Sequence, residues 1–174
     1  MKRALFVVFC AFVFLGTIGG CEETESVEES LEVNVLNGAI TVDTYCDNGG
    51  CEDLALLAFT LRLDMETPLP ENDEVTFLQY RIDYTLTGVK EKVPYFSAPI
   101  EVIVHNNDDI AMSLQVAGSR QRAFLKKEIG TDTVMGTGKV TLAGYDEKDN
   151  RIDYTFGFNI HFGDFTTAPP SIEE

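Results

Sequence analysis

The strongest constraint on the fold of this chain is the alternation of large apolar and polar residues between positions 151 and 163. The apolar side chains there occupy every second position: Ile152, Tyr154, Phe156, Phe158, Ile160 and Phe162. A period of two residues is typical of a β-strand and places all of these side chains on one face. Burying one such side chain is worth about 1.5–3 kcal/mol, so this segment should be a central, core-facing strand.

The same alternation recurs through the chain and predicts further strands at 31–35, 39–45, 57–65, 78–86, 100–104, 110–116 and 137–145. Turn-forming residues separate these segments at 37–38, 67–73, 106–109 and 146–150. Segment 118–132 is the least clear. It has two alternatives, an edge strand around 123–125 or a helical turn.

These patterns predict an all-β, antiparallel domain of about eight or nine strands. One buried and one solvated face per strand favours a two-sheet sandwich of the immunoglobulin or fibronectin kind. The chain has no Trp and lacks the inter-sheet Cys pair of true immunoglobulin domains, so the expected likeness is architectural. The alternative is a closed, lipocalin-like barrel.

The N-terminus has the pattern of an export signal. Lys2 and Arg3 precede an unbroken apolar run over 4–15, and small residues follow. The tetrapeptide Ile18-Gly19-Gly20-Cys21 then resembles the lipobox of bacterial lipoproteins. The resemblance implies cleavage after Gly20 and lipid attachment at Cys21. Ordinary secretion and a membrane anchor are the alternatives. Glu22, where Asp would favour inner-membrane retention, points to the outer membrane or the cell surface.

The predicted organisation is a signal peptide over 1–20, an acidic flexible tether over 21–30, the β-domain over 31–165 and a disordered tail over 166–174. Loss of two basic residues with the signal peptide takes the formal net charge from −16 to −18. Such a charge repels nucleic acid, which we do not expect as a partner. The expected partners are the membrane, through the lipid, and a protein of the envelope or surface.

Two cysteines in the exported part, Cys46 and Cys51, flank a loop rich in turn formers. Export to an oxidising compartment and opposed positions in a hairpin favour a structural disulfide. A zinc site needs more ligands than these two, and a redox site would favour a closer spacing.

Three turns rich in Asp and Asn, at 47–53, 106–109 and 146–150, could supply oxygen ligands to calcium. The candidates are Asp47, Asp108, Asp109, Asp146 and Asp149. None of these runs has the spacing of an EF-hand loop, so solvated turns are the default interpretation. We predict no other metal or cofactor.

A basic cluster is formed by Arg120, Arg122, Lys126 and Lys127. It could meet a phosphate, an acidic glycan or an acidic partner. The commoner use of such a cluster is a charged edge that prevents aggregation between sheets.

The pentapeptide Arg-Ile-Asp-Tyr-Thr occurs twice, at 81–85 and 151–155. In both copies the alternation points Ile and Tyr inward, and Arg and Asp outward. The flanking residues differ, which favours coincidence over an ancient duplication.

No motif for nucleophilic, metal-dependent or nucleotide-dependent catalysis is present. The two histidines, His105 and His161, fall on the polar faces of their strands. The sequence therefore favours a non-enzymatic, lipid-anchored envelope protein whose β-domain serves in protein–protein interaction or surface assembly. The alternatives are a lipoprotein that binds calcium or a small ligand and, third, an enzyme with an unrecognised site.

Overall fold

The computed structural model describes residues 27, 30–45, 55–65 and 74–165, which form eight strands and one helix. The elements are β1 (Leu31–Val35), β2 (Ile40–Asp43), β3 (Leu56–Leu63), β4 (Glu74–Leu86), β5 (Phe96–His105), β6 (Asp109–Gln115), α1 (Ser119–Ile129), β7 (Val134–Asp146) and β8 (Arg151–Gly163). The prediction of an all-β domain is confirmed.

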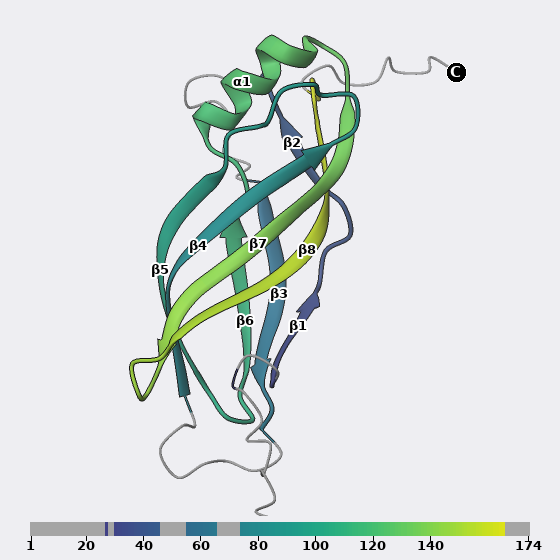
Figure 1. The fold of residues 1–174 in the computed structure, drawn as a ribbon. Coiled ribbons are helices and arrows are strands. Elements are labelled where there is room, and N and C mark those ends of the chain that lie inside the picture. Colours follow the sequence, from purple (N-terminus) through teal and green to yellow (C-terminus); the bar gives the residue numbers. More distant parts are fainter. Residues whose placement is uncertain (1–26, 28–29, 46–54, 66–73, 166–174) are drawn as a thin grey trace, which may run out of the picture.

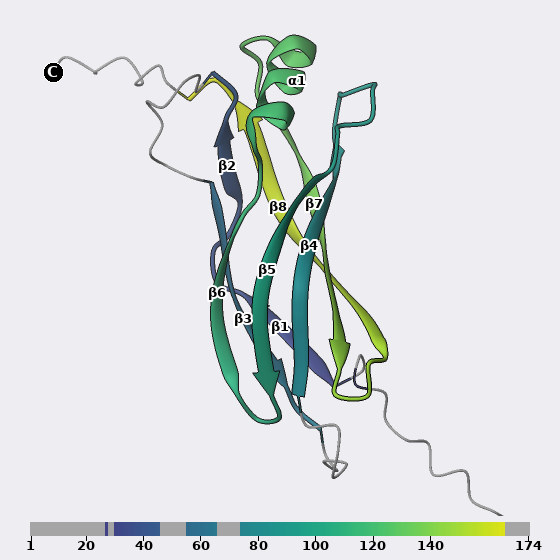
Figure 2. The same ribbon diagram turned by 90° about the vertical axis from the view of Figure 1, so that its left-hand side faces the viewer.

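The strands pair into two sheets that pack face to face (Figures 1 and 2). The smaller sheet has the order β1-β3-β6, and the larger has the order β2-β8-β7-β4-β5. The described strands thus form two sheets, not the closed barrel that was the alternative. The prediction of purely antiparallel pairing is wrong at one place, because β2 runs parallel to β8.

The alternation over 151–163 does form one long strand, β8. Its inward side chains are buried at Ile152, Phe158, Ile160 and Phe162, and half-buried at Tyr154 and Phe156. β8 pairs with β7 over nearly its full length but with β2 only over 160–163. The strand is therefore next to the edge strand of its sheet rather than at its centre.

A β-bulge shifts the inward row of β4 by one residue. Val75 and Phe77 are fully buried before the bulge, and Tyr80 and Ile82 are buried after it. The pairing register with both neighbours shifts between Phe77 and Gln79. Leu78, predicted to face the core, is instead 46% exposed, because the extra residue of a bulge leaves the ladder.

The chain changes sheets between β1 and β2, where the sequence predicted only a turn. Asn37 bridges this crossing to β3: its side-chain amide donates to the Leu56 carbonyl, and its side-chain oxygen accepts from the Ala58 amide, both at 2.9 Å. The side chain thereby replaces the strand pairing that the crossing interrupts. β1 can remain in the smaller sheet while β2 joins the larger one.

The predicted turn at 106–109 joins β5 to β6, but β6 does not return along β5. It pairs with β3 in the opposite sheet. The Asn106 side chain accepts from the Met65 amide at 2.9 Å, and the Asn107 amide donates to the Leu63 carbonyl at 2.7 Å. These bonds connect the turn to the end of β3, so the chain crosses between sheets here.

The unclear segment 118–132 holds the helix α1, which closes one end of the sandwich (Figure 1). Gln121 and Leu125 are its buried side chains, and Gly130 ends it with a φ of 59°, which favours glycine. Among the described residues, no helix has the length and apolar character that a membrane span requires. The edge-strand alternative for this segment is wrong.

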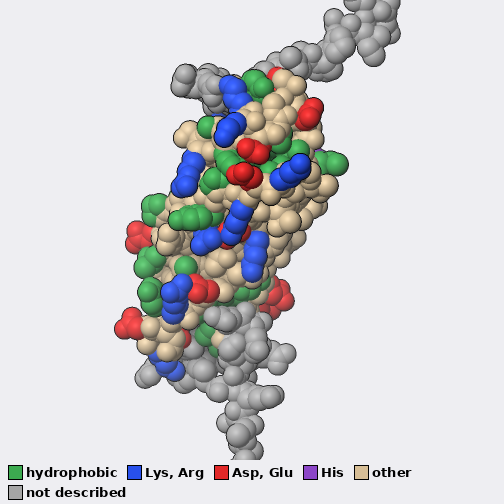
Figure 3. All heavy atoms as spheres, turned by 45° about the horizontal axis from the view of Figure 1, so that its top comes forward, with side chains coloured by type: hydrophobic (Ala, Val, Ile, Leu, Met, Phe, Trp, Pro, Cys, Tyr) green, Lys and Arg blue, Asp and Glu red, His purple; other side chains and the backbone are tan. Residues whose placement is uncertain are grey.

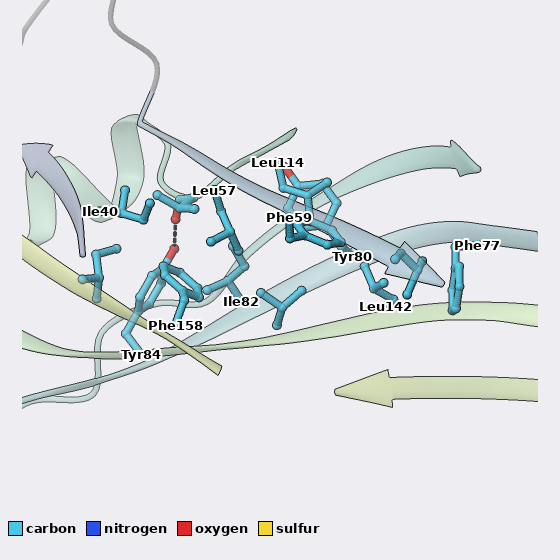
Figure 4. Close-up of a cluster of buried hydrophobic side chains, with 14 of the residues drawn as sticks. Ile40, Leu57, Phe59, Phe77, Tyr80, Ile82, Tyr84, Leu114, Leu142 and Phe158 are labelled. Carbon is cyan, nitrogen blue, oxygen red and sulfur yellow. Dashed lines mark hydrogen bonds between the residues drawn. The ribbon is translucent and has the colours of Figure 1, made fainter. Parts of the chain in front are cut away.

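Two tyrosines of β4 connect the sheets through the core. The Tyr80 hydroxyl donates to the Gln115 carbonyl at 3.0 Å, and the Tyr84 hydroxyl donates to the Val116 carbonyl. Figure 4 shows Tyr80 and Tyr84 among the buried side chains of both sheets, with the Tyr84 bond drawn. Burial is the main cause that raises the pKa of each phenol, so both stay protonated.

Candidate functional site

A groove of about 430 Å³ lies on the outer face of the larger sheet. It crosses strands β4, β7 and β8 and reaches the residues at the start of β5; its lining includes Gln79, Arg81, Asp83, Tyr95, Ser97, Thr141, Ala143, Arg151 and Asp153. Its volume falls within the range of about 300–1,000 Å³ that is typical of ligand sites. Figure 3 shows Lys and Arg side chains gathered over this face and over α1, with Asp and Glu beside them.

Small residues of β7 form the floor of the groove. The alternation that buries Val140 and Leu142 turns Thr141 and Ala143 outward. β4 and β8 pair with opposite edges of β7, so they lie about 10 Å apart across this floor. The floor is therefore a shallow trough between two raised rows of longer side chains.

The two copies of the repeated pentapeptide supply those rows. In β4, Arg81 Nε and Nη2 donate to Asp83 Oδ2 and Oδ1 at 2.8 and 2.7 Å. In β8, Arg151 Nη2 lies 3.1 and 3.0 Å from Asp153 Oδ1 and Oδ2. The predicted outward direction of Arg and Asp is confirmed. The sheet also places the copies on either side of one strand, which the sequence did not indicate.

The wall beside β4 is made by Tyr95, just before β5. The Arg81 guanidinium lies 4.2 Å from the centre of the Tyr95 ring, a cation–π contact. Gln121 of α1 fixes the backbone there, because its buried side-chain amide donates to the Tyr95 carbonyl at 2.7 Å. The helix thus positions one wall of the groove.

The charges that line the groove are balanced, and Lys139 of β7 is exposed beside Asp83 just outside the lining. Hydrogen bonding by Asp83 is the main cause that raises the pKa of Arg81, and Asp153 does the same for Arg151. Both guanidinium groups stay charged, each beside its own carboxylate. The groove therefore presents many hydrogen-bond donors and acceptors with little net charge.

Comparison with known proteins does not identify a family. No family model and no curated protein matches the chain. Among solved structures, a protein from Archaeoglobus fulgidus matches with a TM-score of 0.39 and 14% identity, over 81% of this chain and 98% of that one. A putative late embryogenesis abundant (LEA) protein matches with a TM-score of 0.42 and 13% identity, over 78% of this chain and 72% of that one.

Several sequence-predicted sites lie outside the described residues. These are the signal peptide with Cys21, the Cys46 and Cys51 pair, Asp47 and the tail over 166–174. Lipidation and the disulfide remain predictions. Of the predicted tether, Val27 and Ser30 are described and buried, and the Ser30 carbonyl accepts from the Asp64 amide at 2.9 Å.

The described calcium candidates occupy two turns at one end of the sandwich (Figure 2). Asp108 is in the β5–β6 connection and Asp109 is the first residue of β6, while Asp146 is the last residue of β7 and Asp149 is in the turn of the β7–β8 hairpin. Within the part of the chain that the structure describes, no three His, Cys, Asp or Glu side chains are grouped to hold a metal.

Asp146 is the internal acceptor of its own hairpin turn. Its carboxylate accepts from the Lys148 and Asn150 amides and from the Asn150 side chain, at 2.8–2.9 Å. Burial alone would raise the pKa of Asp146, but these hydrogen bonds together lower it. The carboxylate is thus already committed to shaping the turn.

The predicted basic cluster lies on α1 and not on a strand edge. Lys126 and Lys127 are in the last turn of the helix, where cations interact favourably with its dipole. Lys126 Nζ also lies 4.6 Å from the centre of the Tyr45 ring. The interpretation as a charged edge that prevents sheet aggregation is therefore wrong, while an interaction patch stays a prediction.

Neither histidine lines the groove. His105 is at the end of β5, and its Nδ1 lies 3.4 Å from Oε2 of Glu74 across the β4–β5 pair. His161 is half-buried in β8. Sequence reasoning missed the groove because its walls come from strands far apart in the chain. The repeated pentapeptide was the one signal that marked it.

Proposed function

We propose that the protein is a non-enzymatic, lipid-anchored protein of the bacterial cell envelope, exposed at the outer membrane or cell surface, whose β-domain binds an envelope component through the groove. The observation that carries this proposal is the pair of Arg–Asp bridges from the repeated pentapeptide, held on either side of β7, where Thr141 and Ala143 form the floor of the groove. Long charged side chains kept in one geometry beside a hollow are what a recognition site needs.

The placement of the elements supports anchoring through the N-terminus. β1 begins at the end of the sandwich that carries the β5–β6 and β7–β8 turns, and α1 lies at the opposite end (Figures 1 and 2). A lipid on Cys21 would hold the first end toward the bilayer. The groove would then face sideways and α1 would face away from the membrane, so both would be accessible to partners.

The finer fold assignment, an immunoglobulin-like sandwich, is part of this proposal. The strand order supports it. The first strand is divided between the sheets as β1 and β2. β3 and β6 then join β1 in the smaller sheet, and β4, β5, β7 and β8 join β2 in the larger one. Immunoglobulin-like domains divide their strands in this way, with a hairpin of the last two strands inside the larger sheet.

Anchoring is tested by labelling cells with radioactive palmitate. The intact chain should carry label in the membrane fraction, and the Cys21→Ser variant should lose it. Label that persists without Cys21, or an intact chain that takes up none, would contradict the lipoprotein assignment.

Binding is tested by capture from detergent-solubilised envelopes with the full chain as bait. The double variant Arg81→Gln, Arg151→Gln should lose the captured component. Arg62→Gln is the matched control, because Arg62 makes the same kind of exposed pair with Asp64 on the opposite sheet, at 3.4 Å. Equal capture by both variants would contradict a role for the groove.

A further inference from the structure

We infer that the component bound in the groove is a neutral saccharide; this inference rests on the proposed function and names the ligand class of the same site. The first argument is charge. Each guanidinium of the groove is paired with a carboxylate, so a strongly anionic ligand would approach Asp83 and Asp153, and a strongly cationic one would approach the arginines. Like charges brought this close are costly, so both charged classes are disfavoured.

The second argument is the arrangement of hydrogen-bonding groups. The bridge between Arg81 and Asp83 uses two of the five N–H donors of the guanidinium and one contact at each carboxylate oxygen. Further donors and lone pairs remain side by side, and both side chains are partly exposed, at 47% and 35%. A hydroxyl group both donates and accepts, so neighbouring hydroxyls on a sugar ring match this arrangement.

The third argument is shape. Strands β4 and β8 are about 10 Å apart across β7, and their Arg–Asp pairs are staggered along it, Arg81 level with Thr141 and Asp153 level with Ala143. An α-helix with its side chains is about 10–12 Å across and would not enter. A peptide strand binds by extending a free sheet edge. Both edges of the floor strand β7 are already paired. A six-membered ring lying flat on Thr141 and Ala143 fits the remaining space.

The fourth argument is continuity along the sheet. A second hollow of about 380 Å³, lined by Leu78, Gln79, Ser97, Ala98 and Pro99, shares Gln79 and Ser97 with the groove. The β4 bulge creates it by turning Leu78 outward. The trough is thus polar at one end and more apolar at the other. Sugars in a chain present both hydroxyl edges and C–H faces, so the trough has room for more than one unit.

The test is calorimetric titration of the full chain, with Cys21→Ser to prevent lipidation, against neutral hexoses, N-acetylhexosamines and their disaccharides. At least one should bind, and a disaccharide should bind more tightly than its monosaccharide. Arg81→Gln with Arg151→Gln should weaken binding at least tenfold, as expected for the loss of charged hydrogen bonds. Arg62→Gln should leave binding unchanged. Exposed ion pairs contribute little to stability, so the variants should remain folded, which circular dichroism verifies.

The inference would be overturned if no neutral saccharide bound at millimolar concentration, or if binding were unaffected in the double variant. Capture of an envelope protein that depends on Arg81 and Arg151, without saccharide binding, would refute the inference and leave the proposed function standing. Tight binding of poly-glutamate or poly-lysine in the groove would contradict the charge argument. If the chain with Arg81 and Arg151 intact showed neither saccharide binding nor envelope capture, both proposals would be refuted.

Discussion

Replacing Tyr84 with Phe removes one hydrogen bond that joins the two sheets. Tyr84 is buried, with 7% of the residue exposed, and its hydroxyl donates to the carbonyl of the fully buried Val116. Removing the donor leaves a buried carbonyl without this bond, and such a loss costs about 1–3 kcal/mol. In a domain of this size, each kcal/mol corresponds to a fall in Tm of about 2–4 °C.

The same residue predicts a pH dependence. Burial is the main cause that raises the pKa of Tyr84 well above its ordinary value near 10. Above that pH the unfolded chain releases the phenolic proton, whereas the folded chain keeps it. Stability from this group is therefore complete below about pH 10 and decreases as the pH rises, by up to about 1.4 kcal/mol per pH unit.

Urea unfolding should show that Tyr84→Phe has a lower free energy of unfolding than the intact chain near neutral pH. This difference in free energy should shrink above about pH 10. Tyr145→Phe is the matched control, because Tyr145 is 45% exposed and its hydroxyl is not in the core. It should change stability by less than about 0.5 kcal/mol. The reasoning would be refuted if Tyr84→Phe were as stable as the intact chain near neutral pH, or if the difference in their free energies of unfolding did not change above about pH 10.

Three further predictions concern the scaffold of the domain. Gly138→Ala should lower stability by about 1–3 kcal/mol, because its Cβ would lie 2.3 Å from the Phe158 ring. Gly157→Ala is the control and should be nearly neutral, because no atom would lie nearer than 3.8 Å to its Cβ. Thermal melts measure both variants. Asp146→Ala should cost about 1 kcal/mol at neutral pH. Hydrogen bonds lower the pKa of Asp146 in the folded chain, so the stability that its carboxylate contributes is complete above its ordinary pKa and is lost as the pH falls through the folded value. In urea unfolding, the free energies of unfolding of Asp146→Ala and the intact chain should therefore converge in acid. Gln121→Ala should destabilise by about 1–3 kcal/mol and weaken binding in the groove, measured by melting and by the same titration; unchanged binding would contradict the role of α1 in positioning the wall.

Strict alternation predicted the strands well where the ladder is regular. In the β7–β8 hairpin, Val140 pairs with Phe156 and Leu142 with Tyr154, and the inward rows follow the sequence. The sequence failed at Leu78, because a bulge changes which face a residue occupies without leaving a compositional mark. A single extra residue reverses the direction of every side chain before it.

Strand partners were less predictable than strand positions. Asn37 and Asn106 appeared as ordinary turn residues, yet their side chains bond to β3 or to the chain just after it, and hold crossings between sheets. Such bonds join residues far apart in the sequence, so no local pattern reveals them. The helix was obscure for a similar reason, because its stability depends on burying Gln121 and Leu125 against the end of the sandwich.

The candidate site was only half visible in the sequence. The outward direction of Arg81 and Arg151 follows from alternation alone. Their placement on the two sides of β7 depends on the strand order β8-β7-β4, which no local pattern specifies. Tyr95 carried no signal, since its place beside Arg81 depends on an irregular connection and on Gln121.

Site-specific photo-crosslinking in intact cells tests the central claim most directly. A benzophenone side chain is placed at Ser97, an exposed residue that lines the groove, or at Ser113, which is also exposed and lies on β6 in the opposite sheet. The account predicts a crosslinked envelope component from position 97 and none from position 113. Crosslinking from position 113 alone, or from neither position, would contradict the claim that the groove is the binding surface.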